Sequence, residues 1–419
     1  MYQSGLVFGS LLMLLSVLAT VVSIDMLTDA SDHYRCRTYE DLVERALGKR
    51  GRQLTELSIV VSCVGVLVAY LIAVGDILEP FVGTEHRALS LILCWATTAM
   101  PLSLLRTVDS LKWASSTGMI SIGLLVIAAM HHVQLDVESH QTYALADMLW
   151  PADGARSVLV ACPIVLFAFN CQANVSSIYE ELPRKESMRG VTRTSMSFCA
   201  VIYLVMGLIG MWDFGPSVLP NILANYHNPK YVYLQIAFAS MAIALIMAFP
   251  LNVFPARTTI FGLLNSSNNV SDDLMTDLQE PLLDESGDSP KDDEHVDSGR
   301  LLTNTTVDLE SGTQDASSDS GDGSSVSSLP SVLPPPEAGL CSHVWVSFLV
   351  AGSSLGFALV VPNISVVFGL LGGTMGSLIG FVLPGMCGVA MGRPAGWLLI
   401  VPGTVVGVLT TAVTVYSSF

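Results

Sequence analysis

The chain has 419 residues, of which 51% are hydrophobic and only 13% are charged, and its mean hydropathy is +0.57. Soluble domains carry about 25% charged residues, so this composition excludes an ordinary soluble protein and predicts an integral membrane protein. The net charge of -17 comes from one stretch, since residues 263–340 hold 17 of the 36 acidic residues and only Lys291 and Arg300 among the bases. The acidity therefore belongs to that segment and not to the whole protein.

Ten apolar segments are long enough to cross the ~30 Å hydrocarbon core of a bilayer as helices. They are residues 5–27, 57–78, 88–105, 111–130, 157–175, 195–212, 232–254, 344–361, 364–386 and 397–416. If the loop after the first segment is cytoplasmic, 16 basic residues lie on that side and 3 on the other, as expected for cytoplasmic loops. We predict an all-α polytopic membrane protein, with bundle helices in residues 1–261 and 343–419.

The loop at residues 262–342 is rich in Ser, Asp, Gly and Pro and poor in aromatic residues. Such a segment cannot bury enough apolar surface to offset the entropy of ordering, so we expect it to be disordered. The charge distribution places it in the cytoplasm. Residues 297–302 read D-S-G-R-L-L, the spacing of an acidic dileucine signal, which makes sorting or regulatory proteins candidate partners.

A short helix is predicted in the cytoplasmic stretch 38–51. Thr38 and Asp41 have the spacing of a capping box. The apolar stripe at helical spacing is expected to face the membrane. Its members are Tyr39, Leu42, Val43, Ala46 and Leu47.

The segment at 157–175 is the most informative for function. Pro163 is followed by three amides, Asn170, Gln172 and Asn174, which spread around the helix. We expect the helix to unwind there or to border a water-filled cavity, because amides facing lipid would stay unsatisfied; hydrogen bonds between helices are the alternative. Charged residues lie only near helix ends, which favours a neutral or zwitterionic solute.

Two further segments carry backbone-altering residues. Pro250 and Pro255 should leave carbonyls free near the end of the segment at 232–254, with Arg257 capping its inner end. The glycines of the segment at 364–386 indicate close helix packing. They are Gly369, Gly372, Gly373, Gly376 and Gly380. A G-x-S-x-G match at residues 352–356 lies in an apolar helix, so we expect no enzyme, and no metal-ligand spacing is present.

Several motifs follow one another in order along the chain. They are YEDLVERALG at 39–48, VAYLIAVGD at 68–76, FAFNCQ at 167–172, YEEL at 179–182 and PLNVFPAR at 250–257. Together they resemble the amino acid/auxin permease family, and within it the sodium-coupled neutral amino acid transporters. The resemblance implies two inverted five-helix repeats plus an eleventh helix. The ten segments here would then lack the first family helix, and we expect Met1 to be an internal start, from a truncated gene model, an alternative start or a degenerate copy.

The resemblance also implies positions for the sites. Substrate would be bound at Phe167, Asn170 and Cys171, with Gln172 and Asn174 beside them. A cation would bind near Asn252 and Ala248. Sodium-coupled relatives commonly have Thr or Ser where this chain has Ala248, so the coupling ion, Na+ or H+, stays open, and Asp76 is the first carboxylate to test for H+.

The expected function is therefore secondary active transport of neutral amino acids by alternating access, without a cofactor other than the coupling ion. The alternative is a non-transporting amino-acid sensor or scaffold with an incomplete bundle. The expected partners are a neutral amino acid and the lipid bilayer, and no nucleic acid. The membrane would be the plasma membrane or a vacuolar or lysosomal one.

Overall fold

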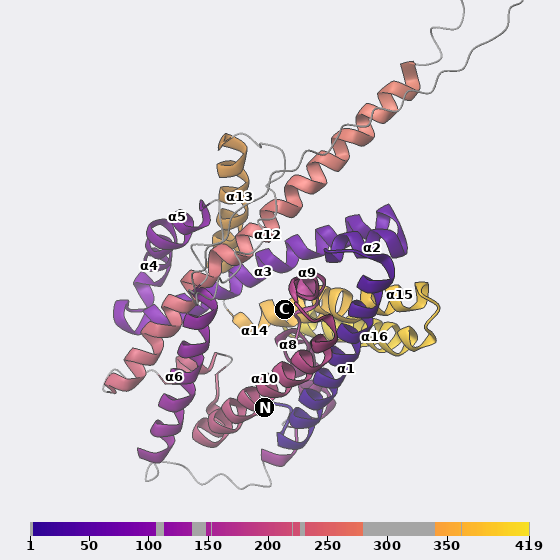
Figure 1. The fold of residues 1–419 in the computed structure, drawn as a ribbon. Helices are drawn as coiled ribbons and strands as arrows, with labels where there is room; N and C mark the ends of the chain where they lie inside the picture. Colours follow the sequence, from indigo (N-terminus) through magenta and orange to yellow (C-terminus); the bar gives the residue numbers. More distant parts are fainter. Residues whose placement is uncertain are drawn as a thin grey trace, which may run out of the picture. The chain divides into compact units, whose positions relative to one another are not determined.

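The computed structural model describes residues 3–105, 113–135, 148–151, 153–219, 221–226, 231–279, 340–361 and 363–418 (Figure 1). All regular elements in these ranges are helices. The chain divides into two units, one formed by Met1–Leu264 with Ala338–Phe419 and the other by Asn265–Glu337. In the second unit, the described residues 265–279 are the end of a helix. The expected disorder of the acidic loop after residue 279 lies outside the described residues, as do the loops at 106–112 and 136–147.

Within the described ranges, nine helical spans are long and apolar enough to cross a membrane. They are α1 (Leu6–Tyr34), α3 (Lys49–Val82), α6 (Ala114–Leu135), α8 (Ala155–Ala168) with α9 (Val175–Glu181), α10 (Met188–Phe214), α12 (Val232–Gln279), α13 (Leu340–Val360), α14 (Ile364–Leu371) with α15 (Leu383–Ala390), and α16 (Trp397–Ser418). Shorter helices are α2 (Tyr39–Leu47), α4 (Arg87–Cys94), α5 (Met100–Ser103) and α11 (Ile222–Asn225). Large apolar side chains such as Leu14 (56% exposed) and Leu398 (73%) point outward, as in a protein surrounded by lipid. The predicted all-α polytopic architecture is confirmed.

The segment expected at 88–105 does not form one regular helix. A π-helical turn, Trp95–Ala99, separates α4 from α5. Pro101 has no N–H and crowds the preceding turn, and the Thr98 hydroxyl donates to the Cys94 carbonyl at 2.6 Å. Both features favour the wider turn. The interrupted run is shorter than the nine spans above, which accounts for the difference from the ten predicted segments.

Helix α2 begins at the predicted cap. The Thr38 side chain accepts a hydrogen bond from the Asp41 N–H at 3.3 Å. The expectation that its apolar stripe faces the membrane is wrong, because Tyr39 and Leu42 are fully buried in the protein core. The Tyr39 hydroxyl donates to the Ile379 carbonyl at 2.9 Å, so α2 is a structural part of the bundle.

Helix α12 passes through both of its prolines and continues to Gln279, beyond the predicted end at residue 254. Arg257 does not cap a helix end as predicted. It is only 3% exposed and its Nη1 donates to the Ser103 carbonyl at 3.3 Å and to the Ser347 hydroxyl at 2.9 Å. The guanidinium therefore ties α12 to α5 and α13, inside the bundle.

The glycine-rich stretch connects α14 to α15 and packs against α8 and α16. It contains two π-helical turns, Gly372–Gly376 and Leu378–Val382, between α14 and α15. A Cβ on Gly372 would overlap the Pro163 carbonyl of α8, and one on Gly407 of α16 would lie 2.8 Å from the Gly373 carbonyl. The prediction that these glycines allow close helix packing is confirmed.

Candidate functional site at a broken helix

The helix predicted at 157–175 is broken in its second half. Helix α8 ends at Ala168, residues 169–171 are not helical, and a 3-10 turn, Gln172–Asn174, leads into α9. Pro163 lies inside α8, and its carbonyl packs against the backbone of Gly372, where a side chain would overlap it. The Tyr203 hydroxyl of α10 donates to the Ala168 carbonyl at 3.2 Å, which satisfies one group freed by the break. The unwinding expected from the three amides is present.

Gln172 stabilises the broken backbone. Its Oε1 accepts a hydrogen bond from the Cys171 N–H at 2.9 Å, and the side chain is fully buried. Its Nε2 has no hydrogen-bond partner among the described residues and lies 3.6 Å from the position of a Cβ on Gly380. The described hydrogen bond of Gln172, a predicted substrate-binding residue, is thus a structural one.

Asn170 differs from Gln172 in its surroundings. It is half-buried, its Nδ2 lies 3.7 Å from the position of a Cβ on Gly376, and no side-chain hydrogen bond to it occurs within the described residues. Phe167 packs on Phe368 of α14, with ring centroids 5.5 Å apart. Cys171 is half-buried and Asn174 is exposed. Phe167 and Asn170 therefore lie beside the same glycine-rich stretch.

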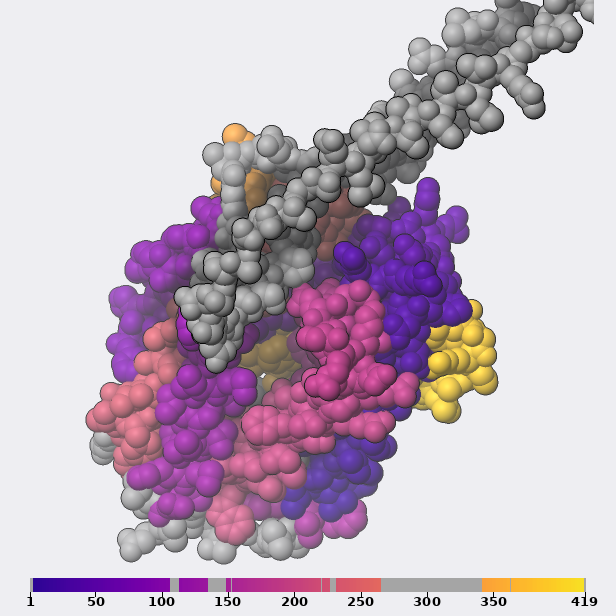
Figure 2. Space-filling view, viewed as in Figure 1, coloured from indigo at the N-terminus to yellow at the C-terminus, as the bar shows by residue number. Residues whose placement is uncertain are grey.

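The backbone at the break contributes acceptors of its own. The N–H of Asn170 donates to the Phe167 carbonyl at 3.0 Å. Among the described residues, no backbone N–H donates to the carbonyls of Phe169 and Asn170. Carbonyls at this depth in a membrane protein need a partner, which a ligand or water can supply. Figure 2 shows that this face of the molecule is hollowed between α6 and the pink residues of α9 and α10.

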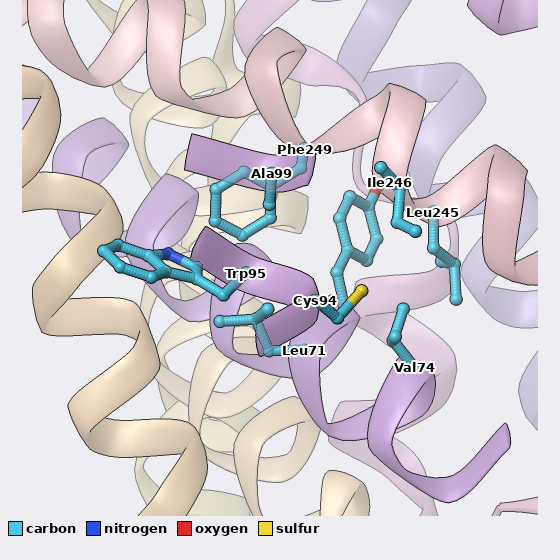
Figure 3. A pocket seen from close by; sticks show the side chains of 9 residues that line it. Leu71, Val74, Cys94, Trp95, Ala99, Leu245, Ile246 and Phe249 are labelled. Atoms are coloured by element: carbon cyan, nitrogen blue, oxygen red, sulfur yellow. The ribbon is translucent and has the colours of Figure 1, made fainter. Parts of the chain in front are cut away.

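A small pocket lies in another part of the bundle, between α3, the π-helical turn Trp95–Ala99 and α12 (Figure 3). It is lined by Tyr70, Leu71, Val74, Cys94, Trp95, Ala99, Leu245, Ile246 and Phe249. Because Pro250 has no N–H, the Ile246 carbonyl has no intrahelical donor. The free carbonyl expected from the prolines is therefore that of Ile246, and α12 continues past Pro250.

The predicted cation residues separate into two groups. Asn252 and Ala248 lie together on α12, where Asn252 Nδ2 donates to the Ala248 carbonyl at 3.3 Å and the Asn252 side chain lies near the Tyr70 hydroxyl. Asp76 is elsewhere, near the far end of α3, where its oxygens accept from Arg87 at 2.7 Å and from Asn221 at 2.8 Å. The structure thus brings Asn252 and Ala248 together and leaves Asp76 in a separate ion pair.

At the end of the bundle that the charge distribution assigns to the cytoplasm, two carboxylates of α1 form a network. Asp29 pairs with Arg393 and, at 3.2 Å, with Arg189. Asp32 accepts from the Tyr179 hydroxyl at 2.5 Å and lies 3.8 Å from Lys185. We call these residues the cytoplasmic network. They connect α1 to the start of α10, to α9 and to the connection between α15 and α16.

At the opposite, outer end, His132 of α6 and Asp213 of α10 form a buried pair. His132 Nδ1 lies 3.0 Å from Asp213 Oδ2, and the side chains are 10% and 3% exposed. Sequence reasoning missed this pair because its members are 81 residues apart. The signal that could have found it is a polar residue at the outer edge of each of two neighbouring apolar segments.

A multi-pass helical bundle with an unwound membrane helix defines the structural class of this protein. The family model described as "Transmembrane amino acid transporter protein" matches residues 1–418, so the chain belongs to that family. The amino acid transporter AVT6B of Arabidopsis thaliana is 27% identical over 288 residues, 62% of each chain. Vacuolar amino acid transporter 6 of Saccharomyces cerevisiae is 27% identical over 357 residues, 80% of this chain and 71% of the relative.

The sodium-coupled neutral amino acid transporter 7 of Danio rerio is also similar, with 26% identity over 245 residues, 54% of this chain and 51% of the relative. The matched part of AVT6B is 62% of its length. The resemblance found in the sequence motifs is thus confirmed at the level of the family. The relatives include proteins named as vacuolar transporters and one named as sodium-coupled.

Proposed function

We propose that the protein is a secondary transporter that moves small neutral amino acids across a membrane by alternating access, coupled to Na+ or H+. The family membership and the names of the similar proteins support amino acids as the transported class. The name of the Saccharomyces cerevisiae relative supports a vacuolar membrane, and the name of the Danio rerio relative supports Na+ as a coupling ion. The break between α8 and α9 supports the location of the site.

The observation that carries the proposal is the set of polar groups at Phe169 and Asn170. Two carbonyls that receive no backbone N–H can accept hydrogen bonds from an ammonium group, and the Asn170 amide can donate to a carboxylate. The described contacts of Phe167, Asn170 and Cys171 involve apolar groups, backbone, a cysteine, a glycine or the Gln172 amide, and no charged side chain. Such a site fits a zwitterion whose side chain is neutral.

Alternating access requires that one end of the bundle opens while the other stays closed. The cytoplasmic network joins α1, α9 and α10 through Asp29 and Asp32. These contacts fit a cytoplasmic end that is closed in this conformation. Opening would have to separate them, and the exposed positions of Arg189 and Lys185 keep the cost of that separation low.

The test is uptake of radiolabelled L-alanine, L-glutamine and L-leucine into vesicles that contain the full chain. Asn170→Ala should weaken apparent affinity about 5- to 150-fold, since a buried polar contact is worth about 1–3 kcal/mol. The matched control is Asn363→Ala, which removes an exposed amide that makes no cap hydrogen bond and should leave uptake unchanged. Normal uptake by Asn170→Ala would place the substrate elsewhere.

The coupling ion is tested in the same vesicles by replacing Na+ and, separately, by imposing a pH gradient. Asn252→Ala should change the dependence on the cation more than the affinity for the amino acid, because Asn252 lies beside Ala248 and Tyr70 and away from the break. An uptake that needs neither gradient would refute coupled transport. If no amino acid is taken up but binding to the chain is measurable, the sensor alternative is favoured.

A further inference from the structure

The outer end of the bundle contains a cluster of titratable and aromatic groups around His132. The imidazole contacts Asp213 of α10 through Nδ1. Its ring meets the edge of Tyr226 at 5.2 Å and of Tyr231 at 5.6 Å between centroids, and it stacks on Phe214 at 6.5 Å. Three parts of the chain therefore converge on one imidazole: α10, the connection after α11, and the residues before α12.

The neighbours of this cluster are mostly uncharged. His131, adjacent on α6, faces Tyr233 at 4.8 Å between ring centroids, and Tyr233 faces Tyr231 at 5.5 Å. Tyr226 is 1% exposed and its hydroxyl interacts with the Asp213 carboxylate. Burial, with the adjacent Asp213 charge, raises the pKa of the Tyr226 hydroxyl. This hydroxyl therefore stays protonated at physiological pH.

The carboxylate favoured by the sequence as a proton acceptor is less suited to that role. Both oxygens of Asp76 are engaged, one by Arg87 at 2.7 Å and the other by Asn221 at 2.8 Å. A guanidinium keeps its charge at every biological pH, so this contact is a fixed ion pair. Histidine, in contrast, is the side chain that changes its charge between about pH 5 and 8.

We propose that His132 and Asp213 form the proton-binding site of this protein, and that proton uptake there holds the outer end of the bundle closed. Protonation converts the hydrogen bond between a neutral imidazole and a carboxylate into a buried ion pair between α6 and α10, in which both partners are charged and the contact is stronger. The Tyr226 ring packs on His132 and on Phe214, at 5.2 and 4.8 Å between centroids, and extends the link to residues 221–226. The inference rests on the proposed transport function only where proton coupling of uptake is concerned.

The direction of the pH effect follows from the charge of the pair. The two side chains form an ion pair only while the imidazole carries a proton, and that ion pair joins α6 to α10 in the closed form. Closure is therefore strengthened as the pH on the outer side falls through the range in which histidine titrates, and it is weakened as the pH rises. A proton that enters from an acidic outer compartment would close the outer end behind a bound substrate.

Hydrogen–deuterium exchange of the wild-type chain in lipid tests this without any transport. The amides of Leu219 and Leu223 are hydrogen-bonded to Asn225 Oδ1 and Asn221 Oδ1, at 2.7 and 3.2 Å. After correction for the intrinsic pH dependence of exchange, their protection should be about fivefold or more greater near pH 5.5 than near pH 7.5. A flat profile in the wild-type protein would overturn the proposal.

Variants then assign the effect to the pair. His132→Gln keeps a polar side chain without a charge change, and Asp213→Asn removes the partner charge; each should abolish the pH dependence of protection. His131→Gln is the matched control, because it removes the neighbouring exposed histidine that faces Tyr233, and it should leave the dependence intact. If His132→Gln retains it, or His131→Gln loses it, His132 is not the proton acceptor.

The transport readout separates this proposal from the proposed function. With coupling at His132, a pH gradient should accelerate amino acid uptake by the wild type and by His131→Gln, and should not accelerate it in His132→Gln. Uptake that is absent from the wild type would refute the transport function and leave the exchange result valid. An equal acceleration in both proteins would refute the role of His132 in coupling.

Discussion

The two ends of the bundle are held together by different chemistry. At the cytoplasmic end, Asp29 and Asp32 pair with Arg189, Arg393 and Lys185, whose charges do not change at biological pH. At the outer end, the interhelical link between α6 and α10 is the His132–Asp213 pair. The partners of the cytoplasmic network are half-exposed, whereas the outer pair is buried. The comparison predicts that the outer end responds to pH and the cytoplasmic end does not.

The largest expected effect is at Gly372, midway between the ends, where α14 meets α8. Gly372→Ala would drive a Cβ into the Pro163 carbonyl, a backbone atom that cannot move aside. It should destabilise the protein by about 1–3 kcal/mol or more and disturb both ends alike. The thermal midpoint of the purified protein measures this. Gly356→Ala, where a Cβ meets nothing within 4 Å, should leave the midpoint unchanged or higher.

The next effect is on the cytoplasmic network. Asp29→Asn removes the carboxylate that both Arg189 and Arg393 contact. Ser176 is buried and bonded to Ser31 at 3.2 Å. With the carboxylate removed, the rate at which a cysteine at position 176 reacts with an impermeant maleimide should rise about three- to tenfold. The increase should be the same at pH 5.5 and 7.5.

The control for this experiment is Asp25→Asn, one turn earlier on α1, whose carboxylate makes no hydrogen bond within the described residues. The native cysteines give a background that is measured in the chain without Ser176→Cys. A labelling increase that depends strongly on pH would remove the distinction between the two ends.

A smaller effect is expected from the fixed ion pair at the outer end. Asp76→Asn breaks the contact with Arg87, which retains Glu79 at 3.3 Å. Protection of the Leu223 amide should fall about two- to threefold, equally at both pH values, because the pair contains no histidine. Glu85→Gln removes an exposed carboxylate at the same end and should have no effect. A pH-dependent loss in Asp76→Asn would move the proton site from His132 to Asp76.

The smallest effect is expected at Glu40 of α2. Burial raises the pKa of this carboxyl above its ordinary value, so the folded state binds its proton more tightly. The resulting stability is present at low pH and is lost as the pH rises through the folded-state pKa. Glu40→Gln should therefore raise the free energy of unfolding at pH 7 by less than about 1 kcal/mol, seen as a slightly higher thermal midpoint, and should not raise it at pH 4. Glu44→Gln, which loses a 2.6 Å contact with Arg52, should lower it.

The sequence determined those features that depend on near neighbours. The apolar segments predicted the membrane helices, and Thr38 with Asp41 predicted the start of α2. Pro163 and the amides after it predicted the break at 169–171, since a missing N–H and polar groups in a membrane helix act within a few residues. That Asn170 and its neighbours bind substrate stays a prediction.

Tertiary structure decided those features that depend on which helices lie side by side. Arg257 is buried and donates to Ser103 of α5 and Ser347 of α13. Both prolines of α12 are accommodated within one helix. The partners of His132 lie far away in the chain, and nothing in local composition or periodicity specifies them. A buried polar group must find a partner, but only the packing of the helices determines which residue that partner is.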